Sequence, residues 1–165
     1  MIIVEGFDNS GKSTLVKKLS KDLKLLVMNN QRLPKSAVDV QDYLSLCGSI
    51  NHRYPLILDR LSVISEPIYG PICRDQSILT PLILAHMRAQ LLELNPAIVY
   101  CRPPTPAILN FEEEQMEGVV DKAMTLIAAY DFHMSQLDEL GFNVVVYDWQ
   151  STGYEDFRDF VKQGI

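Results

Sequence analysis

The stretch MIIVEGFDNSGKS, residues 1–13, joins a short apolar run to a glycine-rich turn that ends in lysine and serine. Residues Gly6–Ser13 match the pattern G-x-x-x-x-G-K-[ST], and a segment with helical spacing follows them directly. In this strand–turn–helix context the backbone N–H groups of the turn face phosphate oxygens, and the dipole of the helix favours negative charge there. The stretch therefore predicts a phosphate-binding loop for a nucleoside triphosphate.

The last residues of the loop have chemical roles of their own. Lys12 supplies a positive charge to the β- and γ-phosphates, and the Ser13 hydroxyl is a ligand for Mg²⁺. A glycine turn that merely precedes a capped helix does not require this pair. The residues expected to bind ATP are Asn9, Ser10, Gly11, Lys12, Ser13 and Thr14.

Five short apolar runs are continuous, which is typical of strands that are covered on both faces. They are Met1–Glu5, Lys24–Met28, Pro55–Asp59, Ala97–Cys101 and Asn143–Tyr147. Helical spacing is found at Lys12–Leu23, about Ser36–Leu46, Ile78–Leu94, about Glu112–Leu140 and Tyr154–Lys162. This alternation predicts a doubly wound α/β fold with a mainly parallel five-stranded sheet and helices on both faces. Residues Leu61–Gln76, with two prolines and a glycine, are predicted to form a long loop at the carboxyl edge of the sheet.

Length and composition predict one globular domain over residues 1–165. Hydrophobic residues make up 47% of the chain and charged residues 22%, which disfavours disorder, collagen and coiled coils. The net charge of −6 disfavours a protein that coats duplex nucleic acid, because such proteins carry a basic surplus. No apolar run is long enough for a membrane span, and Glu5 interrupts the apolar start, so we expect a cytoplasmic protein without a membrane partner.

Several other chemistries lack their motifs. The three cysteines show no C-x-x-C spacing and the three histidines lie far apart, which disfavours disulfide and zinc frameworks. A regulatory GTPase would carry an Asn-Lys-x-Asp motif, and the chain has no Asn-Lys pair. The sequence therefore favours a kinase over a GTP-dependent switch.

Asp59 and Arg60 end the third predicted strand, at the same sheet edge as the phosphate loop. A carboxylate there can hold the water ligands of Mg²⁺, and a guanidinium can bind a phosphate through two hydrogen bonds. The alternative is an exposed ion pair at a strand end.

Two motifs resemble those of thymidylate kinases and their deoxynucleoside kinase relatives. Residues 4–14, VEGFDNSGKST, resemble the LEGxDxxGKST opening of that family, and residues 59–61, DRL, resemble its Asp-Arg-[Tyr/His] motif. The resemblance implies that Asp8 contacts the 3′-hydroxyl of the acceptor nucleotide. It also implies that Asp59 serves the metal and the reacting phosphates, while Arg60 binds the acceptor's phosphate.

The chain departs from the family in three ways. Leu61 replaces the aromatic residue of the second motif, and no arginine-rich lid follows the fourth strand. The chain is also shorter than a typical thymidylate kinase, which favours a trimmed relative such as a viral one, working in a host cytoplasm. Family members commonly dimerise, so the resemblance adds a homodimer to the expectations.

Further candidates come from loops near the predicted site. Arg102, just past the fourth strand, is the first candidate for the catalytic cation of a lid. Arg53 and Arg74 are candidates to bind the acceptor phosphate, Tyr69 to stack on its base, and Glu66 to bind the base edge or a sugar hydroxyl. The alternative to a functional role is, for each arginine, an ordinary surface charge and, for Glu66 and Tyr69, a turn with a packed tyrosine.

A further prediction concerns the loop after the last strand. The resemblance places it beside the adenine of ATP, whereas Trp149 alone suggests a half-buried core residue. Taken together, the sequence predicts Mg²⁺-dependent transfer of the γ-phosphoryl group of ATP to a deoxynucleoside monophosphate, thymidylate or a related or modified one. The alternatives are a kinase with a hydroxyl acceptor, for which Glu66 or Asp59 would be the base, and a P-loop ATPase or regulatory module that transfers no phosphate to a small acceptor.

Overall fold

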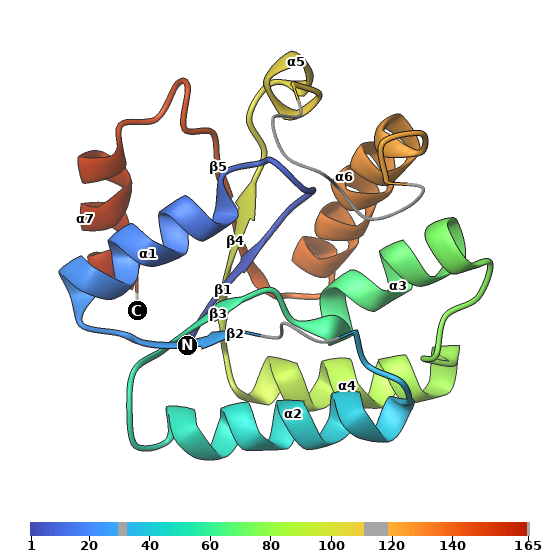
Figure 1. The fold of residues 1–165 in the computed structure, drawn as a ribbon. Coiled ribbons are helices and arrows are strands. Elements are labelled where there is room, and N and C mark those ends of the chain that lie inside the picture. Colours follow the sequence, from blue (N-terminus) through green and yellow to red (C-terminus); the bar gives the residue numbers. More distant parts are fainter. Residues whose placement is uncertain (30–32, 111–118, 165) are drawn as a thin grey trace.

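The computed structural model describes residues 1–29, 33–110 and 119–164 (Figure 1). The elements follow the order β1 (Ile2–Glu5), α1 (Lys12–Leu23), β2 (Leu26–Asn29), α2 (Ala37–Asn51), β3 (Leu56–Asp59), α3 (Ser62–Arg74), α4 (Pro81–Glu93), β4 (Ala97–Cys101), α5 (Thr105–Ile108), α6 (Ala123–Glu139), β5 (Asn143–Tyr147) and α7 (Tyr154–Gly164). The five strands form one sheet in the order β2-β3-β1-β4-β5, and every pair is parallel. The predicted α/β fold is confirmed.

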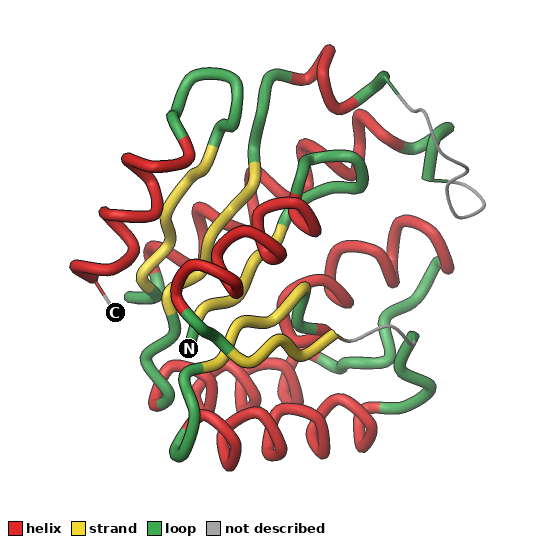
Figure 2. Tube along the Cα trace, turned by 60° about the vertical axis from the view of Figure 1, so that its left-hand side comes forward, coloured by secondary structure: helices red, strands yellow, loops and turns green. Residues whose placement is uncertain are grey.

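The three central strands, β3, β1 and β4, are buried on both faces of the sheet, whereas the edge strands β2 and β5 keep exposed residues. All four residues of β1 are buried, and this strand lies in the centre of the sheet. Its residues alternate between two cores: Ile2 and Val4 pack with α1 and α7, whereas Ile3 packs with α2, α3, α4 and α6. Figures 1 and 2 show these two helical layers on either side of the strands.

Parallel pairing brings the functional segments together at one edge. The phosphate loop follows β1, Arg60 follows β3, Arg102 follows β4 and Trp149 lies after β5. Because β1 lies between β3 and β4, with Val4 beside Asp59 and Glu5 beside Tyr100, these residues all belong to the carboxyl edge of the sheet. This is the edge where open α/β sheets bind their ligands.

The predicted long loop over residues 61–76 is wrong, because residues Ser62–Arg74 form α3. Pro67 and Pro71 lie inside this helix, where each lacks the N–H of a helical hydrogen bond. The apolar side chains of α3, including Ile64 and Ile68, are buried against the core. Burial of such a side chain stabilises by about 1.5–3 kcal/mol, so tertiary packing outweighs the local signals of proline and glycine.

Other boundaries differ from prediction more modestly. Helix α2 continues to Asn51, and the Ser36 side chain caps its start in a capping box with Asp39. The short helix α5 was not expected. Of the helix predicted over residues 112–140, the structure has α6 at Ala123–Glu139, and residues 112–118 lie outside the described residues. Within the described ranges, no helix is both long and apolar enough to cross a membrane.

Candidate active site

Two glycines give the phosphate loop its shape. Gly6 has a φ of 143°, and a Cβ atom there would lie 2.6 Å from the carbonyl oxygen of Cys101. Gly11 has a φ of 87°, and a Cβ atom there would lie 3.1 Å from the ring of Trp149. Residues with a side chain are strained in such conformations. Helix α1 begins directly after Gly11, so its N-terminus and the loop face the same edge of the sheet.

Lys12 is folded back into the loop. Its Nζ donates a hydrogen bond of 2.6 Å to the carbonyl oxygen of Phe7, and the residue is buried. Burial, together with the positive charge of Arg60, lowers the pKa of Lys12 to about 8. A phosphate in the loop would offer this ammonium group a full negative charge in place of a carbonyl dipole.

Ser13 and Asp59 supply two adjacent oxygen donors. The Ser13 hydroxyl donates a hydrogen bond of 3.0 Å to Oδ2 of Asp59. Mg²⁺ is commonly held by one or two protein oxygens together with the phosphates of a nucleotide and water, and this pair fits that pattern. Within the part of the chain that the structure describes, no three His, Cys, Asp or Glu side chains gather into a metal site of their own.

Asp8, Arg60 and Tyr69 form a connected cluster beside the loop, which we call the Asp8 cluster. Nη2 of Arg60 lies 2.5 Å from Oδ1 of Asp8, and the Tyr69 hydroxyl donates a hydrogen bond of 2.9 Å to Oδ2. The Arg60 guanidinium also lies over the Tyr69 ring, at 5.0 Å from its centroid. Arg60 has a φ of 70°, so its backbone adopts a left-handed conformation that is costly for a residue with a side chain. Three residues predicted to bind the acceptor thus lie together.

Glu66 and Arg74, also predicted to bind the acceptor, pair with each other. The Glu66 carboxylate is buried, accepts a hydrogen bond from Arg74 and accepts another from the backbone N–H of Ile78 at 3.1 Å. Gly70 leaves the space for it, because a Cβ atom at that position would lie 2.7 Å from Oε1 of Glu66. The pair therefore holds the turn between α3 and α4.

The two remaining candidate arginines lie at different edges. Arg53 precedes β3, so it lies at the amino edge of the sheet, opposite the phosphate loop, and the structure does not bring it to the other candidates. Arg102 follows β4 at the carboxyl edge. Its Nε donates a hydrogen bond of 2.8 Å to Oδ1 of Asp131, which also accepts one of 2.6 Å from the Tyr100 hydroxyl. Asp131 thus fixes Arg102 against α6.

Asn9 was expected to bind ATP, but its side chain faces α5. The amide nitrogen donates hydrogen bonds to the carbonyl oxygens of Ile108, at 2.9 Å, and Asn110, at 2.8 Å, with a longer contact to Ala107. Asn9 itself has a φ of 63°. The side chain therefore joins the phosphate loop to the turn that follows α5, and only its backbone remains available to a phosphate.

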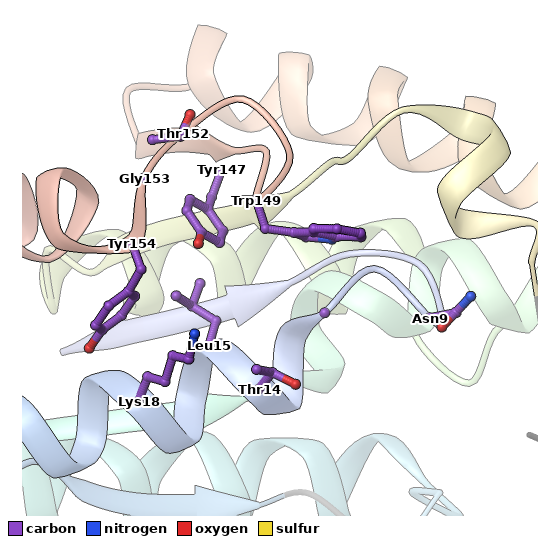
Figure 3. Close-up of a pocket in the computed structure, with 10 residues that line it drawn as sticks. Asn9, Thr14, Leu15, Lys18, Tyr147, Trp149, Thr152, Gly153 and Tyr154 are labelled. Carbon is purple, nitrogen blue, oxygen red and sulfur yellow. The ribbon is translucent and has the colours of Figure 1, made fainter. Parts of the chain in front are cut away.

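A pocket of about 530 Å³ opens between α1 and the loop from β5 to α7 (Figure 3). Trp149 is 45% exposed, so it is half-buried as expected, but it lies beside the phosphate loop and outside the two core clusters. The Tyr154 ring closes another side, where its hydroxyl donates to Asp22 and Lys18 lies over its face. The pocket is lined by Asn9, Gly11, Thr14, Leu15, Lys18, Tyr147, Trp149, Thr152, Gly153 and Tyr154.

Sequence reasoning overlooked a fully buried carboxylate, that of Glu5. It accepts a hydrogen bond of 2.7 Å from the backbone N–H of Leu61 and one of 3.3 Å from the Tyr130 hydroxyl. Burial raises the pKa of Glu5 to about 7 although Arg60 and the Leu61 N–H both act in the opposite direction. The available signal was a charged residue at the end of a continuous apolar strand, at a position whose side chain faces the core.

Comparison with solved structures identifies the fold. The chain is similar to the YorR protein of Bacillus subtilis in complex with phosphorylated GDP, with a TM-score of 0.76 and 22% identity over 98% of this chain and 92% of that one. The fold is that of a thymidylate or deoxynucleoside kinase. It resembles deoxyadenosine kinase from M. mycoides with bound dATP, with a TM-score of 0.61 and 16% identity over 99% and 97% of the two chains.

The same kinase fold occurs in thymidylate kinase from Candida albicans, with a TM-score of 0.63 and 14% identity over 98% of this chain and 88% of that one. No protein-family model matches the chain, and no curated protein matches it by sequence. The resemblance suggested by residues 4–14 and 59–61 is therefore confirmed at the level of the fold.

Proposed function

We propose that this protein is a nucleotide kinase that transfers the γ-phosphoryl group of ATP to a deoxynucleoside monophosphate. One observation carries the proposal: the phosphate loop has the Ser13–Asp59 pair at its end, a pocket on one side, and the Asp8 cluster on the other. A triphosphate in the loop would have its base in the pocket. Its γ-phosphate would then face a second site, in which the Arg60 guanidinium can bind a phosphate.

The donor side would bind its nucleotide largely through the backbone. The N–H groups of the loop and the N-terminus of α1 favour phosphate oxygens, and Lys12 adds a charge. The pocket has aromatic walls formed by Tyr147, Trp149 and Tyr154, which suit a flat nucleobase. Ser13 and Asp59 would hold Mg²⁺, which when bound neutralises charge on the transferring phosphate.

The acceptor side would bind a monophosphate through Arg60. Its guanidinium is held by Asp8 and Tyr69, so little freedom is lost when a phosphate binds. The oxygen of a monophosphate is already a nucleophile, and the chain therefore needs no strong general base. Catalysis would consist of holding the two phosphates in line and neutralising the charge between them, with Arg102 as a candidate further cation.

A nucleoside kinase, whose acceptor group is a hydroxyl, is the second candidate function. It is favoured by the likeness to deoxyadenosine kinase. That reaction requires a base to take the hydroxyl proton. Glu66 is poorly suited, because Arg74 and the Ile78 N–H already bind its carboxylate. Asp59 remains as the base for this alternative.

An assay with γ-labelled ATP separates these functions. The purified protein is incubated with Mg²⁺ and a panel of nucleosides and nucleoside monophosphates, and labelled products are resolved by charge. Label in a deoxynucleoside diphosphate is the expected result. Label in a monophosphate would establish the hydroxyl acceptor instead, and release of labelled inorganic phosphate alone would indicate an ATPase.

A further inference from the structure

Glu5 lies where the phosphate loop, the turn after β3 and helix α6 meet. It is the last residue of β1, directly before the loop glycine Gly6, and its side chain is 0% exposed. An ionisable carboxyl group in such a place is costly unless its oxygens are hydrogen-bonded. The two oxygens have different partners, which are the backbone N–H of Leu61 and the hydroxyl of Tyr130.

The partner at Leu61 matters because Arg60 is strained. The backbone of Arg60 is left-handed, and its N–H donates a hydrogen bond of 3.0 Å to the carbonyl oxygen of Val4. The next N–H, that of Leu61, donates to Glu5 at 2.7 Å. Strand β1 therefore holds the peptide groups on both sides of the Arg60 Cα atom. A strained conformation persists only when its surroundings hold it in this way.

The partner at Tyr130 extends the same arrangement to the side chains. The Tyr130 ring is fully buried and meets the Tyr69 ring edge-on, with centroids 5.9 Å apart. Tyr69 in turn donates its hydroxyl to Asp8 and accepts a hydrogen bond of 3.2 Å from Arg60. Glu5 is thus connected to the Arg60 guanidinium by two routes, one through the backbone and one through the two tyrosines.

We propose that Glu5 is a positioning residue for acceptor binding: by accepting the Leu61 N–H and the Tyr130 hydroxyl, it holds the Arg60 guanidinium where the acceptor's phosphate binds. The proposal rests on the proposed function. Because Glu5 is fully buried, a bound nucleotide would not reach it, and its contribution to acceptor affinity should depend on Arg60.

A double-mutant cycle tests this dependence. Glu5→Met removes both acceptor oxygens with little change of volume, and it is combined with Arg60→Ala. Affinity for a deoxynucleoside monophosphate is measured by calorimetry, together with kcat and KM. In the wild-type background Glu5→Met should weaken acceptor binding roughly tenfold, on the scale of one lost hydrogen bond to a charged group. In the Arg60→Ala background it should cause no further loss.

Equal losses in both backgrounds would overturn the proposal, because Glu5 would then act on stability or on another group. Glu5→Gln keeps an oxygen for the Leu61 N–H and a polar partner for Tyr130, so it should restore acceptor affinity to within about threefold of wild type. Affinity for ATP should change little in all variants. If Glu5→Met does not fold, Tyr130→Phe, which removes only the hydroxyl that donates to Glu5, takes its place in the cycle.

A second readout does not depend on kinase activity. The guanidinium of Arg60 is observed by ¹⁵N NMR, with its signal assigned through Arg60→Lys. Restricted rotation in the wild type should be lost in Glu5→Met and kept in Glu5→Gln. If wild type binds no monophosphate yet this pattern appears, the proposed function fails and the positioning role stands. An unchanged Arg60 signal in Glu5→Met would overturn the positioning role by itself.

Discussion

The two sides of the phosphate loop differ in the chemical groups that line them. On the α1 and α7 side, the pocket is lined by two glycines, three aromatic rings and a few polar side chains, and it contains no ion pair among its described lining residues. On the α3 and α6 side, charged and hydroxyl groups bind each other: Asp8 with Arg60 and Tyr69, Glu66 with Arg74, and Asp131 with Arg102. The first side suits any flat base with a phosphate tail, whereas the second already satisfies its own charges.

This difference predicts how the two sides respond to mutation. Removing a pocket wall loses contact area and leaves no charge behind, so the effect stays confined to the donor. Removing one member of an ion pair leaves its partner with an unsatisfied charge, and such losses spread to neighbours. Variants on the acceptor side should therefore change both affinity and stability, whereas variants of exposed pocket residues such as Trp149 should change affinity alone.

Lys12→Ala should have the largest effect, because in the proposed function Lys12 binds the phosphates that both sides share. We expect kcat/KM to fall by about a thousandfold or more, equivalent to about 4 kcal/mol of transition-state stabilisation. The melting temperature should remain near that of wild type, since the hydrogen bond that Lys12 donates goes to a backbone carbonyl oxygen and Lys12 is in no ion pair among the described residues. Lys17→Ala, exposed on the same helix, is the matched control. Retained activity in Lys12→Ala would contradict the phosphate-loop assignment.

Arg60→Ala should separate the two sides. Loss of the guanidinium should weaken acceptor binding by about ten- to hundredfold, the scale of a hydrogen bond to a charged group, while ATP affinity stays nearly constant. Asp8 would lose one of its two partners, the one of opposite charge, so the free energy of unfolding should also fall. Arg53→Ala, at the opposite edge of the sheet, should leave both affinities unchanged. Loss of ATP binding with intact acceptor binding would place Arg60 on the donor side.

The buried carboxyl group of Glu5 makes stability depend on pH. Its pKa in the folded protein is about 7, above the ordinary value of 4.5, so the folded state binds more protons than the unfolded state between these values. Relative to Glu5→Gln, wild type should therefore lose up to about 3 kcal/mol as pH rises from 4.5 to 7. Urea unfolding at several pH values measures this difference, with exposed Glu155→Gln as the control. A difference that stays constant across this range would contradict it.

Asp8→Ala tests whether the acceptor side recognises the 3′-hydroxyl group of the sugar. Each oxygen of the carboxylate has one partner and room for another hydrogen bond, so a 3′-hydroxyl could also donate to it. Wild type should prefer an acceptor with a 3′-hydroxyl over its 3′-deoxy analogue by about 1.5–3 kcal/mol in kcat/KM. Asp8→Ala should remove that preference. If Asp8→Ala still prefers the acceptor with a 3′-hydroxyl group, the assignment of a deoxynucleotide acceptor loses this support.

Trp149→Ala should have the smallest effect and only on the donor. Stacking of a base on an aromatic ring contributes about 1–3 kcal/mol, and Trp149 is half exposed, so the lower end is expected. The KM for ATP should rise about tenfold while the acceptor's KM and the melting temperature stay constant. Phe160→Ala, also exposed and outside the pocket, is the matched control. Equal effects of the two variants would show that Trp149 does not contact the base.

The sequence predicts what depends on neighbouring residues along the chain. Gly6–Ser13 defines its own turn, and the continuous apolar strands predict a parallel sheet without knowledge of their partners. Helix α3 was missed because Pro67, Gly70 and Pro71 oppose a helix locally, while the burial that supports it comes from distant elements. The pairing of Glu66 with Arg74 was missed for the same reason, since it depends on the turn that α3 creates.

How the candidate site residues contact one another depends on tertiary structure, which the sequence motifs do not show. Asp8, Arg60 and Tyr69 come from three separate segments, and the sequence could nominate each of them but not their mutual contact. Glu5 was overlooked because a charged residue at a strand end is ordinarily expected to meet water, although its place in a continuous apolar strand indicated burial.

The amide of Asn9 should couple any motion of the phosphate loop to the turn after α5, because its hydrogen bonds join the two segments. Its nitrogen carries two protons and donates hydrogen bonds to carbonyl oxygens of residues about a hundred positions away in the chain. Any rearrangement of the loop around a nucleotide must therefore shift that turn or break these bonds. A fluorescent dye at exposed Leu109, beside the tether, would turn this coupling into an optical sensor of loop occupancy.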